Sequence, residues 1–218
     1  MNPSTHADSR TRLLKATIDL VRAHGYAATR VEDVCTAAGV TKGSFFHHFA
    51  SKEDLAIAAA ETWDQGAQQL FAQASYQRLP GAVERLLGYV SFRRGLLSGD
   101  IWEWSCYAGT TIQEVHETYP DIREACARSI DNHLSFLRSL IEAALREHPV
   151  DDVSAASLAT HMQAVVQGAF VMAKAQQDRK AAIDSVDHLY RYLQLLFARS
   201  SGKKPRKKTT PTSPKESP

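Results

Sequence analysis

Residues 29–55 carry consecutive helix-capping patterns, and this segment constrains the fold more than any other part of the chain. Thr29 followed by Glu32 forms a capping box, so a helix is expected to begin at about Arg30. Gly39 can adopt the positive φ of a tight turn and is expected to end that helix. The residues between them are apolar at the spacing i, i+3, i+4 and i+7, which buries one face of the helix: Val31, Val34, Cys35 and Ala38.

A second short helix and the start of another follow directly. Thr41 can cap the second helix, in which Phe45 and Phe49 share the buried side at i and i+4. Ser51 begins a further capping pattern, so another helix is expected from Lys52. Two short helices joined by a glycine turn, with a third helix behind them, are typical of a helix-turn-helix, whose second helix lies in the major groove of DNA.

The outward side of that second helix supplies the side chains expected to face DNA. Lys42 and Ser44 lie at its N-terminal end, where base edges are read. Gly43 has no side chain, so the backbone can approach the DNA closely. Lys52 lies at a helix start whose free amides favour anions, which suits a phosphate, although a lysine there can also simply stay solvated. The whole outward set is Lys42, Gly43, Ser44, Phe46, His47 and His48.

Residues 9–55 resemble the TetR-type one-component transcriptional regulators. The motifs that carry the resemblance are Gly25-Tyr26, Thr29, Asp33-Val34-Cys35, Ala38-Gly39-Val40-Thr41-Lys42-Gly43, Phe45-Phe46, His48-Phe49 and Ser51-Lys52-Glu53. Cys35 replaces the usual Ala, which is a small-for-small exchange in the core. Phe46 replaces a Tyr whose hydroxyl usually contacts a phosphate, so that hydrogen bond cannot form.

The resemblance implies a DNA contact for each matching residue and an assembly for the whole chain. The implied contacts are, for phosphates, Thr29 and Lys52; for bases, Arg30, Lys42, Gly43 and Ser44; and for the backbone or base edges, His47 and His48, with Thr41 and Phe46 completing the interface. Family members dimerise through their last two helices, which implies a homodimer on a palindromic double-stranded DNA operator. Most of them repress transcription and respond to a small-molecule effector, and both properties are expected here.

The composition argues against several other classes of protein. No apolar run approaches the ~20 residues that a membrane span needs, and the N-terminus lacks a secretory segment, so a cytoplasmic protein is expected. Cys35, Cys106 and Cys126 show no paired spacing, which argues against a disulfide framework or a structural zinc site. The adjacent His47 and His48 point in different directions and have no partner cluster. No metal and no cofactor are predicted.

The net charge of +2 is unevenly distributed along the chain. From Gly202 onward there are six basic residues and one acidic residue, so this tail carries +5 and residues 1–201 carry −3. The tail is too polar and proline-rich to fold, and it is either a solubilising disordered end or a nonspecific phosphate-binding segment. The expected organisation is a helix-turn-helix domain over 1–55, ordered from about residue 9, a helical effector-binding and dimerisation domain over 56–201, and the basic tail over 202–218.

The rest of the sequence has helical periodicity without strand-like alternation, which predicts an all-α fold of about nine helices. The first helix is expected to end at Gly25 and to bury Leu13, Leu14, Thr17, Ile18 and Val21. Later helices are expected at about 52–73, 83–97, 102–116, 121–148, 154–176 and 183–200. The last two have broad apolar faces that form either a dimer interface or intramolecular packing: Leu158, Met162, Val165, Ala169, Ala173, and Val186, Leu189, Leu193, Leu196, Phe197. Small residues that would let two backbones approach closely are Ala164, Gly168 and Ala173.

The central helices supply the residue types of a small-molecule pocket. The candidates are Phe92, Trp102, Trp104, Cys106, Tyr107, His133, Phe136, Met162 and Gln163, with Arg93 as a further polar group. The same residue types also build ordinary cores, so that alternative stays open. An effector could act on DNA binding only by favouring one spacing of the two helix-turn-helix units over another.

The segment 105–109, Ser-Cys-Tyr-Ala-Gly, resembles a Gly-Cys-Leu motif on the sixth helix of one branch of the family, some of whose members sense electrophiles or oxidants through the cysteine. Lys174 falls where such a member carries a lysine near the thiol, and a nearby cation lowers a thiol pKa. Cys106 and Lys174 are therefore a candidate redox pair, and Cys106 is expected to react faster than Cys35 or Cys126. The alternative for Cys106 is a small buried hydrophobic residue.

Two other classes of protein compete with a regulator. A helical thiol or metal hydrolase has little support, because His116-Glu117 lacks the second His of a zinc helix and neither a Gly-rich phosphate loop nor a nucleophile elbow is present. An architectural DNA-binding protein without an effector would not need a large apolar second domain. The sequence therefore favours a sequence-specific transcriptional regulator that is not an enzyme.

Overall fold

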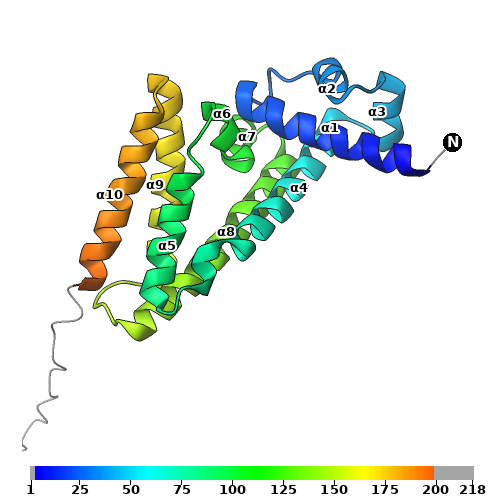
Figure 1. Ribbon diagram of the computed structural model, residues 1–218. Helices are drawn as coiled ribbons and strands as arrows, with labels where there is room; N and C mark the ends of the chain where they lie inside the picture. The colour runs from blue at the N-terminus through cyan, green and yellow to red at the C-terminus, as the bar shows by residue number, and fades with distance from the viewer. Residues whose placement is uncertain (1–2, 199–218) are drawn as a thin grey trace, which may run out of the picture.

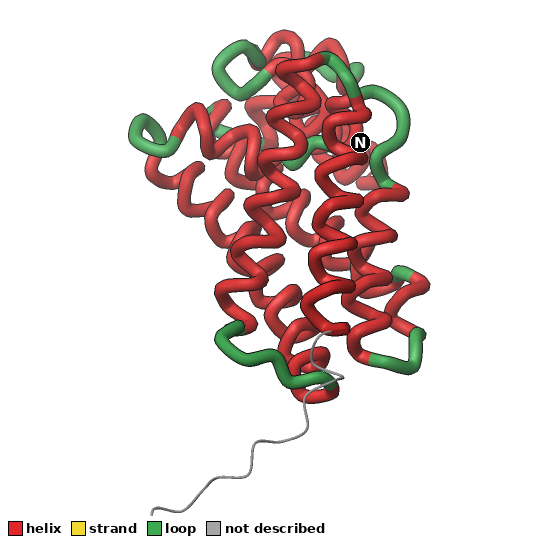
Figure 2. Tube along the Cα trace, turned by 90° about the vertical axis from the view of Figure 1, so that its left-hand side faces the viewer, coloured by secondary structure: helices red, strands yellow, loops and turns green. Residues whose placement is uncertain are grey.

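The computed structural model describes residues 3–198, and all of its regular structure is helical (Figures 1 and 2). Ten α-helices and one short 3-10 helix occur within this range, and it contains no strand. They are α1 (Pro3–His24), α2 (Val31–Ala38), α3 (Lys42–His48), α4 (Lys52–Gln73), η1 (Ser75–Arg78), α5 (Ala82–Gly95), α6 (Ile101–Trp104), α7 (Tyr107–Val115), α8 (Pro120–Glu147), α9 (Ala155–Gln176) and α10 (Arg179–Ala198). The predicted all-α class is confirmed.

The helices form a small unit at one end of the molecule and a larger bundle that extends from it (Figure 1). α1, α2 and α3 make the small unit, and α4 leads away from it with α8 packed alongside. α9 and α10 pack against each other on the opposite side of the molecule, and α5 lies between this pair and α8. α6 and α7 lie where the bundle meets the small unit, and α7 contacts both α1 and α8.

In the helix-turn-helix segment, the end of α2 and the starts of α3 and α4 agree with the sequence-based prediction. Gly39 has φ +61° and ends α2. The Thr41 hydroxyl accepts a hydrogen bond of 3.1 Å from the Ser44 amide at the start of α3. The Ser51 hydroxyl likewise accepts from the Asp54 amide at 3.0 Å, and α4 starts at the next residue. These three predictions are confirmed.

The predicted capping box of Thr29 and Glu32 is wrong. The Thr29 side chain is buried, and its hydroxyl donates to the Gly25 carbonyl at 2.7 Å, so it serves the end of α1 instead. The chain is still extended at Arg30, whose amide donates to the Asp33 carboxylate at 3.0 Å. The cap of α2 is therefore displaced by one residue, and the Glu32 side chain is left on the surface.

The single helix expected over 102–116 is also wrong, because the chain is extended at Ser105 and Cys106 and the region forms α6 and α7. Arg22 of α1 donates to the backbone carbonyls of Glu103 and Ser105, which satisfies the end of α6 from outside the helix. The Cys106 sulfur accepts a hydrogen bond of 3.3 Å from the Gly109 amide and caps α7. The split raises the helix count from about nine to ten.

Two buried hydrophobic clusters hold the helices together. The first joins α1–α3 to the first half of α4, to α7 and to the start of α8, with members such as Phe45, Ala59 and Tyr107. The second joins the end of α4 to α5, α9, α10 and the rest of α8, and half-buried Cys106 packs against both clusters. The helix-turn-helix unit therefore shares a buried cluster with α4, α7 and α8, and the domain boundary at residue 55 stays a prediction.

Three further observations complete the comparison with the sequence. α10 begins at Arg179, four residues before the predicted residue 183. The basic tail over 202–218 lies outside the described residues, so both hypotheses for it stay open. None of the helices within 3–198 combines the length and the apolar character that crossing a membrane requires.

Candidate DNA interface and effector cavity

α3 presents one polar surface because its opposite side is anchored in the core. Phe45 is 0% exposed and Phe49 is 5% exposed, so the side between them faces α1 and α2. Phe46, by contrast, is 54% exposed on the outward side. The predicted interface residues that lie exposed are Arg30, Thr41, Lys42, Gly43, Phe46 and His47, while Ser44 and His48 are half-buried.

Lys42 and Glu32 form an exposed ion pair between α3 and α2. The Lys42 ammonium lies 2.5 Å from a Glu32 carboxylate oxygen. The hydrogen bond between them raises the pKa of Lys42 and lowers the pKa of Glu32, so both groups are charged near neutral pH. Exposed pairs of this kind contribute little stability, so the ammonium can exchange this partner for a base or phosphate at small cost.

Lys52 and Thr29 lie differently from the other predicted DNA contacts. The Lys52 ammonium donates to the Tyr26 carbonyl at 2.7 Å and lies 4.1 Å from the centre of the Tyr26 ring. Burial lowers the pKa of Lys52. Both side chains therefore hold the turn between α1 and α2 in this conformation, and their predicted phosphate contacts stay predictions.

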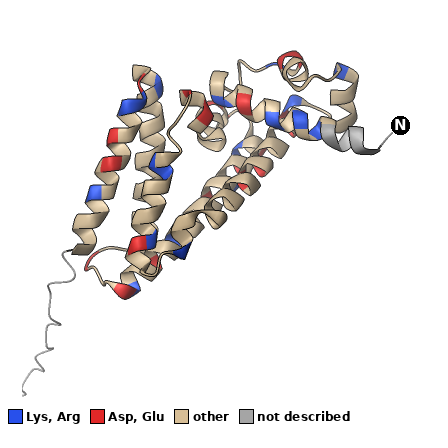
Figure 3. Ribbon diagram, in the orientation of Figure 1, with Lys and Arg blue, Asp and Glu red and all other residues tan. Residues whose placement is uncertain are grey.

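In the part of the chain that the structure describes, basic and acidic residues occur on helices of both the small unit and the larger bundle (Figure 3). Both acidic and basic side chains lie along α10, for example, where Lys180 pairs with Asp184. Within the described residues, the α3 surface is therefore distinguished by which groups it places outward and not by bulk positive charge.

A cavity of about 420 Å³ lies among α1, α4, α5, α6, α8 and α9. It is lined by Ile18, Arg22, Thr62, Trp63, Gly66, Ala67, Leu70, Phe71, Arg93, Leu96, Leu97, Glu103, Trp104, Cys106, Ser129, Ile130, His133, Gln163, Gln167 and Phe170. Trp104, Cys106, His133, Gln163 and Arg93 were predicted from the sequence. The volume and the mixture of aromatic walls with a few polar groups are typical of a small-molecule site.

The other predicted pocket residues lie elsewhere. Tyr107 and Met162 are core residues, 0% and 1% exposed, and the Tyr107 hydroxyl donates to the Ala56 carbonyl. Trp102 lines a groove on the outside of α1, and Phe136 lines a separate hollow. Phe92 packs against the aromatic cluster of the core. These five residues were assigned to the cavity because the sequence does not show which side of a helix faces which neighbour.

α4 supplies the largest group of cavity residues that sequence reasoning missed. Trp63, Ala67, Leu70 and Phe71 recur at i, i+4, i+7 and i+8, and this spacing was the available signal. Arg22 was missed because it belongs to the helix-turn-helix unit. His133 and Tyr89 share a hydrogen bond of 2.8 Å, and burial, followed by the nearby Arg93, lowers the pKa of His133 to about 3. His133 is therefore a neutral polar group of the cavity wall.

Cys106 and Lys174 line one smaller cavity of about 250 Å³ next to the main one, as the predicted pairing requires. The Lys174 ammonium donates to the Arg22 carbonyl at 3.2 Å and to the Thr110 hydroxyl at 3.3 Å. Burial, followed by Arg22, lowers the pKa of Lys174. The other two cysteines are buried, and burial raises the pKa of Cys126 to about 12 and also raises the pKa of Cys35.

Two family models match the chain. The model of bacterial regulatory proteins of the tetR family matches residues 13–59, and the model of the C-terminal domain of LmrA/YxaF-like transcriptional regulators matches residues 82–187. The chain belongs to the TetR family of transcriptional regulators. These regulators bind DNA through a helix-turn-helix and function as dimers.

Individual relatives are more distant. The transcriptional regulator AcuR of Cereibacter sphaeroides is 27% identical over 113 residues, which cover 52% of this chain and 52% of AcuR, so the match spans about half of that relative. The transcriptional repressor NemR of Escherichia coli is 25% identical over 154 residues, which cover 68% of this chain and 74% of NemR. A TetR-family regulator from Chloroflexus aurantiacus superposes with a TM-score of 0.77 at 24% identity, covering 88% of this chain and 96% of that one. The structure of the reduced form of E. coli NemR superposes with a TM-score of 0.72 at 21% identity, covering 86% of this chain and 96% of that one. These structures show a shared fold.

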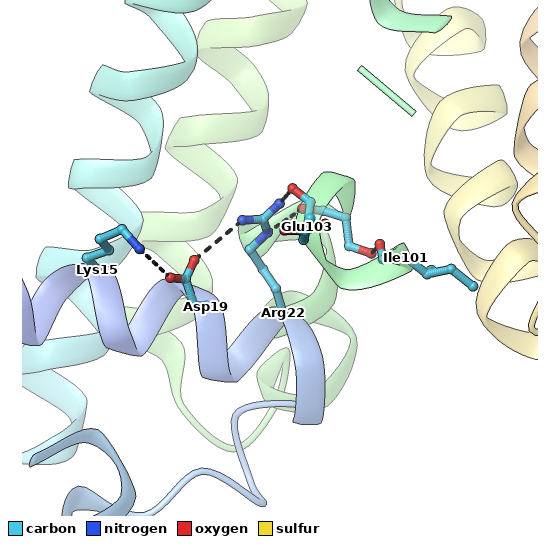
Figure 4. A network of polar contacts seen from close by, with 6 residues as sticks. Lys15, Asp19, Arg22, Ile101 and Glu103 are labelled. Carbon is cyan, nitrogen blue, oxygen red and sulfur yellow. Dashed lines mark hydrogen bonds and ion pairs between the residues drawn. The ribbon is translucent and has the colours of Figure 1, made fainter. Parts of the chain in front are cut away.

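Arg22 connects the helix-turn-helix unit of this TetR-family regulator to the cavity (Figure 4). It is 8% exposed and donates to the Ser105 carbonyl at 2.8 Å and to the Glu103 carbonyl. The Asp19 carboxylate, which is hydrogen-bonded to Lys15, lies 3.7 Å from the same guanidinium. The guanidinium also lies 4.9 Å from the centre of the Trp63 ring. One side chain thus touches α6, α4 and the cavity wall.

Glu114 of α7 makes a second connection to the helix-turn-helix unit. Its carboxylate accepts from the Tyr26 amide at 3.1 Å and from the Ala27 amide at 2.9 Å, in the turn that follows α1. Gly25, with φ +91°, brings the backbone so close to this carboxylate that a Cβ there would lie 2.4 Å from a Glu114 oxygen. α7 therefore begins at Cys106 beside the cavity and ends on the turn before α2.

The apolar faces predicted for the dimer interface mostly pack inside the chain. Those buried are Leu158, Met162, Ala169, Ala173, Val186, Leu189, Leu193 and Phe197, which is the intramolecular alternative. A different apolar face remains exposed on the same two helices: Ala164, Gly168, Val171, Met172, Tyr192 and Leu195. A Cβ added at Gly168 would meet nothing within 4 Å, so a second backbone could approach there.

Proposed function

We propose that this regulator is a homodimeric repressor that binds a palindromic operator through α3 and releases it when an effector binds. The observation that carries the proposal is the surface of α3, a capped helix fixed by the fully buried Phe45 with Lys42, Gly43 and Ser44 at its outward N-terminal end. Residues at this end of a recognition helix contact base edges. A bound dimer that occupies a promoter blocks transcription without further machinery.

The α3 contacts divide into two kinds. Lys42 reaches base edges or phosphates after leaving Glu32, and Ser44 and the open backbone at Gly43 lie beside it. His47 and Phe46 lie further along the outward side, against the DNA backbone. The Thr29 side chain is buried, so the experiment below tests the contacts of α3 and not a contact of Thr29.

The experiment that tests DNA recognition is selection of bound sequences from a random duplex pool by the purified protein, repeated with Lys42→Ala. A palindrome enriched by the wild type and lost by the variant supports the proposal. A folded wild-type protein that enriches no motif at moderate salt contradicts it, and specificity identical in the variant removes Lys42 from base recognition.

The dimer is proposed to form through the exposed apolar face of α9 and α10. A two-fold dimer gives each short α3 helix a second half-site about 34 Å away, which multiplies its affinity. Leu195 is 62% exposed on this face, and Tyr192 and Met172 lie exposed there too. Leu195→Glu is expected to yield a monomer in analytical ultracentrifugation, whereas Leu79→Glu, at an exposed leucine outside α9 and α10, keeps the wild-type mass. A dimer that persists in Leu195→Glu contradicts this interface.

Effector release is proposed to run through Arg22 and Glu114. A molecule in the main cavity contacts Arg22, whose hydrogen bonds to α6 hold the end of α1 in place. A change at Cys106 acts on α7, and Glu114 of α7 accepts hydrogen bonds from the turn before α2. Either event changes the spacing of the two α3 helices only if the effector prefers one conformation over the other.

A thiol-reactive effector is proposed to act at Cys106. Cys106 is half-buried, lines both cavities and lies in the same small cavity as the Lys174 ammonium, while Cys35 and Cys126 are buried with raised pKa values. A thiolate is the reactive form, so the buried cysteines should react slowly. Competitive alkylation at pH 8 with peptide mapping is expected to label Cys106 first and to weaken operator binding in step. If Cys106 proves the slowest of the three, the proposal of thiol sensing is wrong.

A further inference from the structure

Three residues of the main cavity carry a buried polar atom that has no hydrogen-bond partner among the described residues. They are Trp104 with its Nε1, Gln163 with its Oε1 and Gln167 with its Nε2. Trp104 is 8% exposed, so its indole N–H is cut off from bulk water. Buried polar groups are almost always paired, because leaving one unpaired is unfavourable. These atoms are available to a polar ligand in this cavity.

Arg93 adds an unneutralised charge to the same wall. Its guanidinium lies 5.4 Å from the Phe71 ring centre and 5.7 Å from the Phe170 ring centre. Within residues 9–198 it makes no hydrogen bond or ion pair that would neutralise it. Its neighbour Arg94 is paired with Asp187 at 2.6 Å on the outside of the bundle. A partly buried arginine stacked between aromatic faces keeps its fork of N–H donors available for an anion.

The remaining charged and titratable groups of the cavity are already engaged. Arg22 donates to two backbone carbonyls and lies beside Asp19. The Glu103 carboxylate accepts from the Asp100 amide at 2.7 Å and caps α6. His133 is neutral, and its Nε2 is hydrogen-bonded to the Tyr89 hydroxyl. Among the lining groups that the structure describes, three groups without a partner are donors, namely the guanidinium of Arg93, the Trp104 N–H and the Gln167 amide N–H, and one is an acceptor, Gln163 Oε1. The donors outnumber the acceptor, so the cavity favours a ligand with acceptor oxygens.

The rest of the lining defines the body of the ligand. Trp63, Phe71, Trp104 and Phe170 form aromatic walls, and Phe170 lies 5.6 Å from Trp104 as well as next to Arg93. The donors and the aromatic walls thus meet around one residue of α9. A ligand that satisfies both needs one oxygen-rich anionic end and one flat or chain-like apolar end.

We propose that the main cavity binds an amphipathic carboxylate, with Arg93 and the Trp104 and Gln167 donors holding the carboxylate and the aromatic walls holding an apolar body. The proposal rests on the proposed function, because it names the chemical class of the effector for that cavity. A neutral or cationic amphiphile leaves Arg93 without a partner, and a fully polar acid leaves the aromatic walls unfilled.

The test compares matched acids and amides of increasing size. The probes are phenylacetate, 1-naphthaleneacetate and dodecanoate, each paired with its own primary amide, and dissociation constants are measured by isothermal titration calorimetry near neutral pH. At least one carboxylate is expected to bind roughly ten- to a hundredfold more tightly than its amide, which corresponds to one charge-assisted hydrogen-bonded contact.

Variants assign the preference to Arg93. Arg93→Met is expected to abolish the difference between acid and amide, while Arg93→Lys keeps a reduced preference because it keeps the charge without the planar fork. Arg94→Met is the matched control, since Arg94 lies next in α5 but does not line the cavity, and it should bind both probes as the wild type does. Trp104→Phe removes one N–H donor and should weaken acid and amide alike, by roughly three- to tenfold.

Several results overturn the proposal: equal affinities for acid and amide, tighter binding of the amide, a preference that survives Arg93→Met, or no binding of any carboxylate by protein that is folded by circular dichroism. Operator binding measured on the same preparations separates the two proposals. Operator binding without binding of any carboxylate contradicts only the proposed ligand class. Carboxylate binding without operator binding contradicts the proposed function and leaves the proposed ligand class supported.

Discussion

The helix-turn-helix unit and the cavity region use their polar side chains in opposite ways. On α3 most polar groups are exposed, and their bonds join residues near one another in the sequence, as Thr41 does with Ser44 and Lys42 with Glu32. Around the cavity the polar groups are buried, and their bonds join distant residues, such as Tyr89 with His133 and Lys174 with Arg22. The first region is built from local rules and presents its chemistry outward, whereas the second exists only after the chain has folded.

The largest expected effect tests whether the helix-turn-helix unit depends on one anchor. Phe45→Ala removes a side chain that is 0% exposed and is expected to cost about 3–5 kcal/mol of unfolding free energy, with loss of DNA binding. The neighbouring Phe46, 54% exposed, is the matched control, and Phe46→Ala should leave the thermal unfolding temperature nearly unchanged. Equal destabilisation by the two substitutions would break the distinction between the anchored and the outward side of α3.

The second prediction compares two arginines of α1 that each donate to two backbone carbonyls. Arg22→Met leaves the Glu103 and Ser105 carbonyls without this donor and is expected to cost about 2–4 kcal/mol, because the bond to Ser105 is buried and the bond to Glu103 is partly buried. Arg12→Met removes bonds to the Ala38 and Gly39 carbonyls near the surface and should cost less, about 1 kcal/mol.

The same two variants separate stability from coupling. Arg22→Met should also uncouple effector binding from operator release, measured by fluorescence anisotropy of a labelled operator, whereas Arg12→Met should keep the response. Retained release in a folded Arg22→Met protein would mean that the two regions communicate by another route, with Glu114 the next residue to test.

The third prediction concerns exposed lysines in ion pairs. Lys42→Ala should weaken operator binding by about 1–3 kcal/mol per half-site and barely change stability, because its pair with Glu32 is solvent-exposed. Lys180, also exposed and paired with Asp184 on α10, is the control, and Lys180→Ala should bind the operator as the wild type does. Equal losses would indicate nonspecific electrostatics and not recognition by α3.

The smallest expected effect tests the local rule itself. Thr41→Ala removes the cap of α3 and should cost about 1 kcal/mol in chemical unfolding. Thr160→Ala on α9 removes a hydroxyl that only donates back to the Ala156 carbonyl and should cost almost nothing. A Thr41→Ala protein as stable as the wild type would show that α3 is positioned by Phe45 and the core without help from its cap.

The sequence anticipated most of the fold but only part of the cavity. Gly39, Thr41 and Ser51 were assigned correctly, because capping is decided within a few residues. Thr29 was assigned wrongly, because its hydroxyl donates to the Gly25 carbonyl at the end of α1 and does not cap α2. Of the cavity, the sequence identified residue types well and their neighbours poorly.

The sequence by itself determined where α1 and α2 end, where α3 and α4 begin, which face of α3 is outward and that residues 3–198 are helical without strands, because periodicity and caps act over one or two turns. Only the tertiary structure decided the break between α6 and α7, the inward turn of the predicted dimer residues such as Leu193, and the meeting of Arg93 with Trp104 around Phe170. These features depend on partners far away in the chain, such as Arg22 at the end of α6, and on which side of each helix the core selects.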